Sequence, residues 1–380
     1  MRQSSLFAES SLTLGKRAIR LLMALLSFLP ATASSVLAQE SSPESGASWS
    51  VAERREALVR TERVLDNYFY PDRVAALKAI IEANRQSLLQ IPDQKTFAKT
   101  LTSELQDASG DKHLIVWYSD KPINKSSALP SDAAAETRFF QHIDYGFNSA
   151  ARLTGNIGYL NLGGFANMPA AKSTLDAAMA LLSATDAIII DLRGNGGGDS
   201  DTVAYLLGYF FARPIEITGA VVRKHGKFRT DRDFTAATVG GRRYLGKPVF
   251  VLIDHQTISA GEMFAYDLKT LHRALILGEP SAGAAMGLGS PPFVLTEHLS
   301  ISVPDAETRN PYTGTNWDGT GVVPDVATSA KGVLLAGYKR ALESVHDRYD
   351  PMNELPEALH DPAAALKASF PDVSTSSTSR

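Results

Sequence analysis

The sequence predicts an α/β protein with a mainly parallel sheet, preceded by a small helical domain. From Gly155 onward, short β-branched runs alternate with helical patterns in the order β-α-β-α-β-α-β, which is typical of a parallel sheet covered by helices. Before that, residues 51–105 show helical periodicity only. The 380 residues, 44% hydrophobic and 21% charged, are enough to bury a substantial core.

The helical domain is expected at residues 51–110. Its three helical patterns cover residues 51–69, 72–90 and 93–108, and Pro71 and Pro92 separate them. Asp72 and Asp93 each follow one of these prolines and are predicted to be N-caps.

The α/β domain is expected at residues 111–348. It begins with a short strand at residues 114–118, and a polar, alanine-rich connector follows at 120–150. After the connector we expect strands at 155–165, 186–191, 247–254 and 273–280, helices at 169–183, 201–211 and after Ser259, and a hairpin near 214–234. A helix at 330–347 closes the domain, and residues 349–380 are expected to be a tail.

The first 38 residues have the pattern of a secretory signal peptide. Lys16, Arg17 and Arg20 precede an apolar run, and Val36 and Ala38 fit the small-residue rule for cleavage after Ala38. Residues 39–50 then form a polar linker. We therefore expect a periplasmic or secreted protein with no stable membrane anchor after cleavage.

Composition argues against several functional classes. The chain has 38 basic and 41 acidic residues, and removal of residues 1–38 makes it more acidic, so nucleic acid is not an expected partner. It has no cysteine, no HExxH motif and no Asp-rich calcium loop, so neither a metal nor a cofactor is expected.

Ser259 lies where the strand at 249–253 turns into a helix. At a helix N-terminus, unpaired N–H groups can stabilise an oxyanion formed by attack of a serine hydroxyl, so Ser259 is a candidate nucleophile. The same residues, Ser259-Ala260-Gly261-Glu262, also match a capping box, in which the serine is only a helix cap. The local sequence alone favours the cap.

Other parts of the chain offer partners for a nucleophile. Two histidines are candidate bases, His255 just upstream and His113 at the start of the first strand, and Asp318 lies in a glycine-rich loop that could hold an imidazole. The sequence DLRGNGGG at 191–198 lacks the spacing of dinucleotide or phosphate loops. Its glycines can still direct backbone N–H groups at a transient oxyanion.

Several segments resemble serine peptidases of the C-terminal processing peptidase and tricorn core family. These are LTSELQDASGDKHL, GNIGYLNLGGF, DAIIIDLRGNGGG, TISAGE followed by RALILGEPSAG, and TNWDGTGVVPDV, which occur in the family's order across about residues 51–348. The resemblance is closest to the branch with interphotoreceptor retinoid-binding protein modules. It implies a ClpP/crotonase-like α/β domain, and the short interval between His113 and Gly155 leaves no room for a PDZ domain.

The resemblance also implies roles for individual residues. Ser259 would be the nucleophile and His113 the base, with Asp318 at a position that usually bears glutamate. The oxyanion hole would comprise Gly196 or Gly197 and the Ala260 amide. Residues 281–285 lack the lysine base of the bacterial branch, and Lys112 replaces the serine that precedes the histidine in tricorn.

The sequence therefore predicts an exported serine peptidase that hydrolyses peptide or protein substrates through an acyl-enzyme on Ser259. Two alternatives stay open. One is a non-catalytic module that binds apolar ligands or peptides on the same fold, and the other is a hydrolase of small esters.

Overall fold

The structure is a computed structural model, and it describes residues 49–123 and 133–370. The predicted signal peptide, most of the predicted linker and the end of the predicted tail lie outside these residues. No helix in the described ranges is long and apolar enough to cross a bilayer.

The N-terminal part is helical, as predicted. It comprises α2 (Val51–Val64), a 3₁₀ turn η2 (Leu65–Asn67), α3 (Pro71–Ala83), α4 (Arg85–Gln90) and α5 (Gln94–Ser109). Asp93 caps α5 by accepting the Thr96 N–H at 2.6 Å. Asp72 is not a cap, because α3 begins one residue earlier, at Pro71, and the N-cap is Tyr70.

These helices share their core with strands from two distant parts of the chain. Strand β1 (Ile115–Tyr118) pairs with β11 (Leu299–Ser302), which also pairs with β10 (Phe293–Val294). Leu295, Leu299, Ile301 and Val303 pack in the same buried cluster as Leu58, Leu77 and Leu101. The apolar faces of residues 51–110 are therefore covered in part by residues near 300.

The main sheet is six-stranded and almost wholly parallel, in the order β13-β8-β7-β4-β3-β2. Its strands are β2 (Phe147–Leu153), β3 (Ile157–Leu162), β4 (Ala187–Asp191), β7 (Val249–Ile253), β8 (Leu275–Gly278) and β13 (Val326–Ala327). Only β2 is antiparallel to its neighbour. The predicted connector at 120–150 contains α6 (Ala133–His142), a 3₁₀ turn η3 (Asp144–Gly146) and the start of β2.

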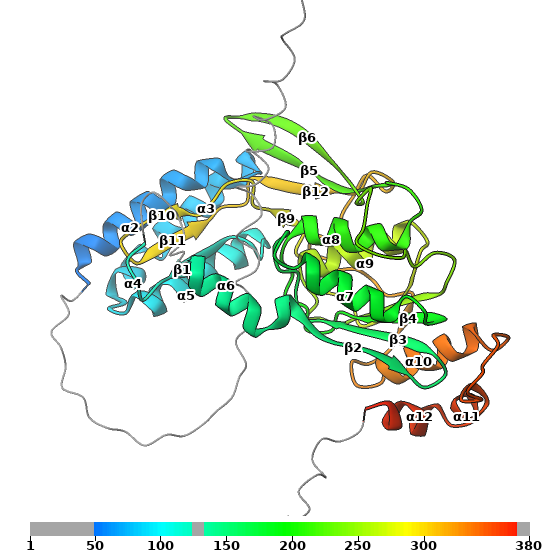
Figure 1. Cartoon of the computed structure of the whole chain (residues 1–380). Coiled ribbons are helices and arrows are strands. Elements are labelled where there is room, and N and C mark those ends of the chain that lie inside the picture. The colour runs from blue at the N-terminus through cyan, green and yellow to red at the C-terminus, as the bar shows by residue number, and fades with distance from the viewer. Residues whose placement is uncertain (1–48, 124–132, 371–380) are drawn as a thin grey trace, which may run out of the picture.

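Helices cover both faces of this sheet (Figure 1). Ile188 and Ile190 face α7 (Lys172–Leu182), α8 (Ser200–Leu207), the 3₁₀ turn η4 (Gly208–Phe210) and α9 (Ala260–Thr270). Ala187 and Ile189 point the other way, toward α10 (Val333–Ser344). This alternation explains why β4 is buried at every position and apolar from Ala187 to Ile190, as expected of a strand buried on both faces.

A smaller sheet lies between the helical part and the main sheet in Figure 1. Its order is β6-β5-β12-β9, with β5 (Glu216–Lys224), β6 (Lys227–Phe234), β9 (Met286–Gly287) and β12 (Ala306–Arg309). Strands β5 and β6 form the predicted hairpin.

The predicted tail is partly structured. Residues 355–369 form α11 (Leu355–His360) and α12 (Pro362–Ser369), and Leu355 and Ala358 are buried against α10. Apolar residues within 355–366 pack against α10 and explain why this segment is structured. The polar residues around them hide this pattern in the sequence.

Candidate active site

Ser259 joins β7 to α9 in a backbone conformation that few serines adopt. Its φ and ψ angles are 57° and −116°, whereas the N-cap residues Ser50, Asp93 and Asp199 all have extended backbones. An ordinary N-cap is extended, and a non-glycine residue with positive φ at this ψ costs about 1–3 kcal/mol. The capping role does not account for this strain, which is the feature of serines presented on strand-to-helix elbows.

The glycine loop after β4 packs directly against this serine. A Cβ atom added to Gly197 would lie 2.8 Å from the Ser259 Cβ and 3.1 Å from the Ile258 carbonyl oxygen. Asn195 fixes the approach, because its carbonyl accepts the Ile258 N–H at 3.0 Å and its side-chain oxygen accepts the Gly197 N–H at 2.9 Å. Glycine is thus required where the loop contacts Ser259.

The donors in this loop are not equivalent. The Gly196 N–H donates to the Gly163 carbonyl at 3.0 Å, and the Gly197 N–H is held by Asn195. Among the described residues, no acceptor is recorded for the N–H of Gly198 or of Ala260, and both residues line a pocket together with Ser259. The hydrogen bonds thus make the Gly198 N–H a candidate oxyanion donor, one residue beyond Gly196 and Gly197, which the sequence suggested.

Glu262 organises the other side of the turn and was considered from the sequence only as a capping residue. Its carboxylate is fully buried and accepts hydrogen bonds from the Ser259 N–H (2.8 Å), the Ser281 hydroxyl (2.6 Å), the Gly283 N–H (2.6 Å) and the Ala284 N–H (2.9 Å). Burial raises the pKa of Glu262, while these hydrogen bonds favour its ionised form. The S-x-x-E spacing in the sequence predicts only the hydrogen bond between Ser259 and Glu262.

Residues 281–285 connect this turn to the other predicted site residues. The Ala282 carbonyl accepts a hydrogen bond from Lys112 Nζ, next to His113. The Ala285 N–H donates to Asp318 Oδ1 at 3.0 Å, and the Gly319 N–H donates to the Gly283 carbonyl at 3.0 Å. One segment therefore contacts the serine helix, the residue before His113 and the Asp318 loop.

His113 is buried and is held through its backbone. Its N–H donates to Asp111 Oδ1 at 2.9 Å, and its ring Nδ1 has no hydrogen-bond partner in the part of the chain that the structure describes. Burial lowers the pKa of His113 to about 4, so the imidazole is neutral at physiological pH. Burial also raises the pKa of Asp111 to about 7.

Asp318 does not orient His113 in this conformation. Within the described ranges no hydrogen bond joins the two side chains, and neither residue lines the pocket at Ser259. Burial raises the pKa of Asp318. The structure thus brings Ser259, Ala260 and the glycine loop together. His113 and Asp318 lie outside the pocket lining, and within the described residues they are not hydrogen-bonded to each other.

His255 is a surface residue. Its side chain is 71% exposed, and Nδ1 lies 3.4 Å from the Glu279 carboxylate. Like His113, it is absent from the lining of the pocket at Ser259.

Two family models match this chain. Residues 156–328 match the model of peptidase family S41, and residues 52–144 match the N-terminal domain that this family has in eukaryotic IRBP. The chain therefore belongs to peptidase family S41, and it is a peptidase of the serine type. This confirms the resemblance seen in the sequence.

Solved structures support the fold. A candidate peptidase from Parabacteroides merdae is 19% identical and aligns over 79% of this chain and 99% of its own, with a TM-score of 0.51. A lipoprotein from Streptococcus agalactiae is 16% identical and aligns over 77% of this chain and 96% of its own, with a TM-score of 0.50. At these identities the similarity concerns the fold alone.

Proposed function

We propose that this peptidase cleaves peptide bonds through an acyl-enzyme on Ser259. The observation that carries the proposal is the strained Ser259 backbone, packed against a glycine loop that leaves no room for a Cβ. A helix cap needs neither feature, whereas a nucleophile must be held rigidly beside the donors that stabilise its product.

The oxyanion hole in this scheme comprises the N–H groups of Gly198 and Ala260. Both residues line the pocket with Ser259, and their amides are the donors of this turn for which the described residues supply no acceptor. Gly196 and Gly197 act indirectly, since their amides hold the loop in place.

His113 is the proposed general base, and its neutral form is ready to accept the Ser259 proton. In the reaction Ser259 Oγ attacks the peptide carbonyl while the imidazole takes its proton. The imidazolium then protonates the leaving amine, and water hydrolyses the acyl-enzyme. Asp318 would stabilise the imidazolium after a local shift of the 281–285 segment, which already contacts both loops.

Single substitutions test these roles. Ser259→Ala should abolish peptide hydrolysis and fluorophosphonate labelling while circular dichroism stays unchanged. His113→Ala should be inactive, and His255→Ala, its matched control, should keep wild-type turnover. Wild-type turnover in Ser259→Ala would remove this serine from the mechanism.

The apolar lining of the pocket favours one alternative, a module that binds apolar ligands without catalysis. Such a module should give no stoichiometric fluorophosphonate adduct at Ser259. A small-ester hydrolase would form the adduct but turn over esters and not peptides, so parallel peptide and ester assays separate all three functions.

We also propose that the chain is exported and cleaved after Ala38. The support is the basic and apolar pattern of residues 1–38, with Val36 and Ala38 fitting the small-residue rule for cleavage. N-terminal sequencing of the protein from a periplasmic fraction or culture medium should begin at Gln39. A mature protein that still begins at Met1 would contradict this.

A further inference from the structure

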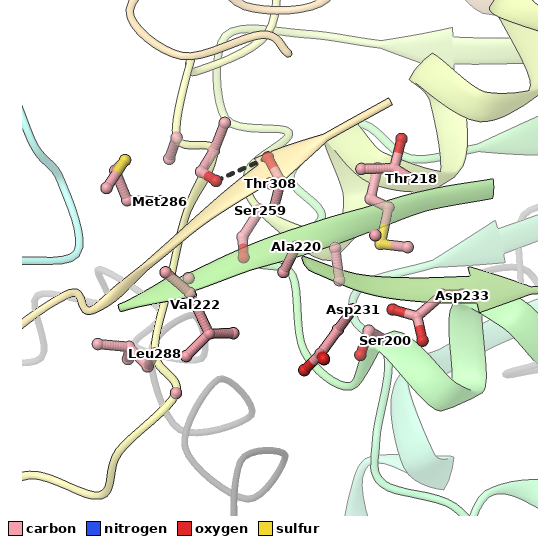
Figure 2. A pocket seen from close by; sticks show the side chains of 18 of the residues that line it. Ser200, Thr218, Ala220, Val222, Asp231, Asp233, Ser259, Met286, Leu288 and Thr308 are labelled. Atoms are coloured by element: carbon pink, nitrogen blue, oxygen red, sulfur yellow. Dashed lines mark hydrogen bonds between the residues drawn. The ribbon is translucent and has the colours of Figure 1, made fainter. Parts of the chain in front are cut away.

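The pocket at Ser259 combines an apolar wall with two carboxylates. Val222, Met286 and Leu288 supply apolar surface, and Asp231 and Asp233 are the charged residues of its lining. No lysine, arginine or histidine lines this pocket among the described residues. Figure 2 shows Asp231 and Asp233 near Ser200, across the pocket from Val222 and Leu288. The pocket therefore offers apolar contact and negative charge to whatever occupies it.

The strand geometry holds both carboxylates on the pocket side. Asp231 and Asp233 are two residues apart on β6, so their side chains project from the same face of the hairpin. In the pairing, Ala220 faces Asp231 and Ile217 faces Asp233, and the extra residue between them makes a β-bulge. A Cβ on Gly219 would lie 2.2 Å from the Asp231 carbonyl oxygen, so glycine allows this close approach.

The existing partner of Asp231 can be displaced. Arg229 Nη2 lies 2.7 Å from Asp231 Oδ2, but the Arg229 side chain is 68% exposed. An ion pair of this kind contributes at most about 1 kcal/mol, because water solvates its charges well and the flexible side chain loses entropy in forming it. A substrate cation in the pocket lies beside two carboxylates, and their combined attraction offsets the cost of removing its water.

We propose that the pocket selects a lysine or arginine side chain on the acyl side of the cleaved bond. This inference rests on the proposed role of Ser259. The aliphatic stem of the substrate residue packs against Val222 and Leu288, and its cationic end pairs with Asp231 and Asp233. Long basic side chains have the required combination, since they bury their methylene groups while keeping the charge paired.

The test uses two peptidyl diphenyl phosphonates that differ only in the residue next to phosphorus. One carries lysine and the other norleucine, which has a similar aliphatic chain without the amine. Mass spectrometry measures the rate of adduct formation at Ser259, and aminocoumarin amides with the same residues give kcat/KM. The lysine compounds should react roughly ten to a hundred times faster, the range expected for a hydrogen-bonded charge pair.

Variants identify the carboxylates as the cause. Asp231→Asn with Asp233→Asn should lower the lysine rate much more than the norleucine rate, so that the ratio of the two rates falls toward one. Glu216→Gln is the matched control and should keep the preference. It removes a carboxylate from the same hairpin, but this carboxylate pairs with Arg232 and does not line the pocket.

Three results would overturn the inference, and they are distinguishable. Equal rates for lysine and norleucine in the wild type refute basic selectivity while leaving Ser259 as the nucleophile. Equal losses for both probes in the double variant mean that the carboxylates only support the hairpin. If neither probe modifies Ser259, the proposed catalytic function itself fails, and this inference fails with it.

Discussion

At the scale of the residue, Ser259 has the hydrogen bonding of a capping box but not the backbone of an ordinary cap. The Ser259 N–H donates to Glu262, as in a capping box, yet the backbone lies at φ 57° and ψ −116°. Glycine adopts positive φ without the steric cost that other residues have. Replacement of Ser259 by glycine should therefore raise stability if the strained backbone matters most, and lower it if the serine is mainly a cap.

We predict that Ser259→Gly stabilises the fold. Relief of backbone strain should raise the free energy of unfolding by about 1–2 kcal/mol, while activity is lost. Ser50, which caps α2 from an extended backbone, is the matched control, and Ser50→Gly should lower the free energy by a few tenths of a kcal/mol. Urea denaturation measures both, and a loss of stability in Ser259→Gly would mean that the serine is mainly a cap.

Burial of His113 predicts a pH dependence of stability. The folded protein keeps this imidazole neutral down to about pH 4, whereas the unfolded chain takes up a proton near pH 6.5. Between these pH values the unfolded state binds more protons, so the free energy of unfolding falls as the pH falls from 6.5 to 4.

The matched substitution is His113→Gln, which does not titrate and keeps the backbone contact with Asp111. From pH 7 to pH 5 the wild type should lose about 1–2 kcal/mol more stability than this variant. Denaturation curves at the two pH values check this, and parallel losses in both proteins would show that His113 titrates normally.

At the scale of the element, the site depends on two backbone segments that contact the β7-to-α9 turn. The glycine loop after β4 lies against Ser259, and residues 281–285 hydrogen-bond to Glu262. Both segments follow the carboxyl ends of strands in the parallel sheet, which is where open α/β sheets place their sites.

Alanine substitutions at two glycines of the same loop distinguish the effect of backbone strain from the effect of steric contact with Ser259. Gly194 and Gly197 have φ angles of 69° and 84°, but a Cβ on Gly194 would meet only Gln256, at 3.6 Å. We predict that Gly194→Ala costs about 1 kcal/mol and keeps fluorophosphonate labelling of Ser259. Gly197→Ala should lose labelling at least tenfold, because its Cβ displaces the serine. Equal labelling in the two variants would contradict the close contact.

At the scale of the whole molecule, the helical part and the α/β part form a continuous structure. Strand β11 completes the core of the N-terminal helices, and the Arg223 guanidinium donates to the Asp66 and Tyr68 carbonyls at 3.0 and 2.9 Å. The loop that holds His113 lies at this junction, so assembly of the proposed base depends on both parts.

We predict that Ile301→Ala destabilises the helical part although it is distant in sequence. Ile301 is fully buried and pairs with Val116, so its truncation should cost about 2–5 kcal/mol. Leu181→Ala, at a position 59% exposed, is the control and should stay within about 0.5 kcal/mol of the wild type. Hydrogen exchange in α3 and α5 should rise in Ile301→Ala, and unchanged exchange there would contradict a shared core.

Local sequence patterns determined most elements of this protein, because helical and strand periodicities depend only on which face of each element is buried. The helices of residues 51–109, the parallel strands and the strand-to-helix position of Ser259 all follow from them. The sequence also offered His113 and Asp318 as candidates. The family resemblance chose His113 over His255 as the base, and these roles stay predictions.

Only the tertiary structure decided the features that depend on contacts between distant segments. The strained angles of Ser259, the acceptors that occupy the Gly196 and Gly197 amides, and the four hydrogen bonds of Glu262 come from packing that no local pattern encodes. The shared core of residues 51–110 with β11 has the same origin, because apolar faces specify burial but not the partner that buries them.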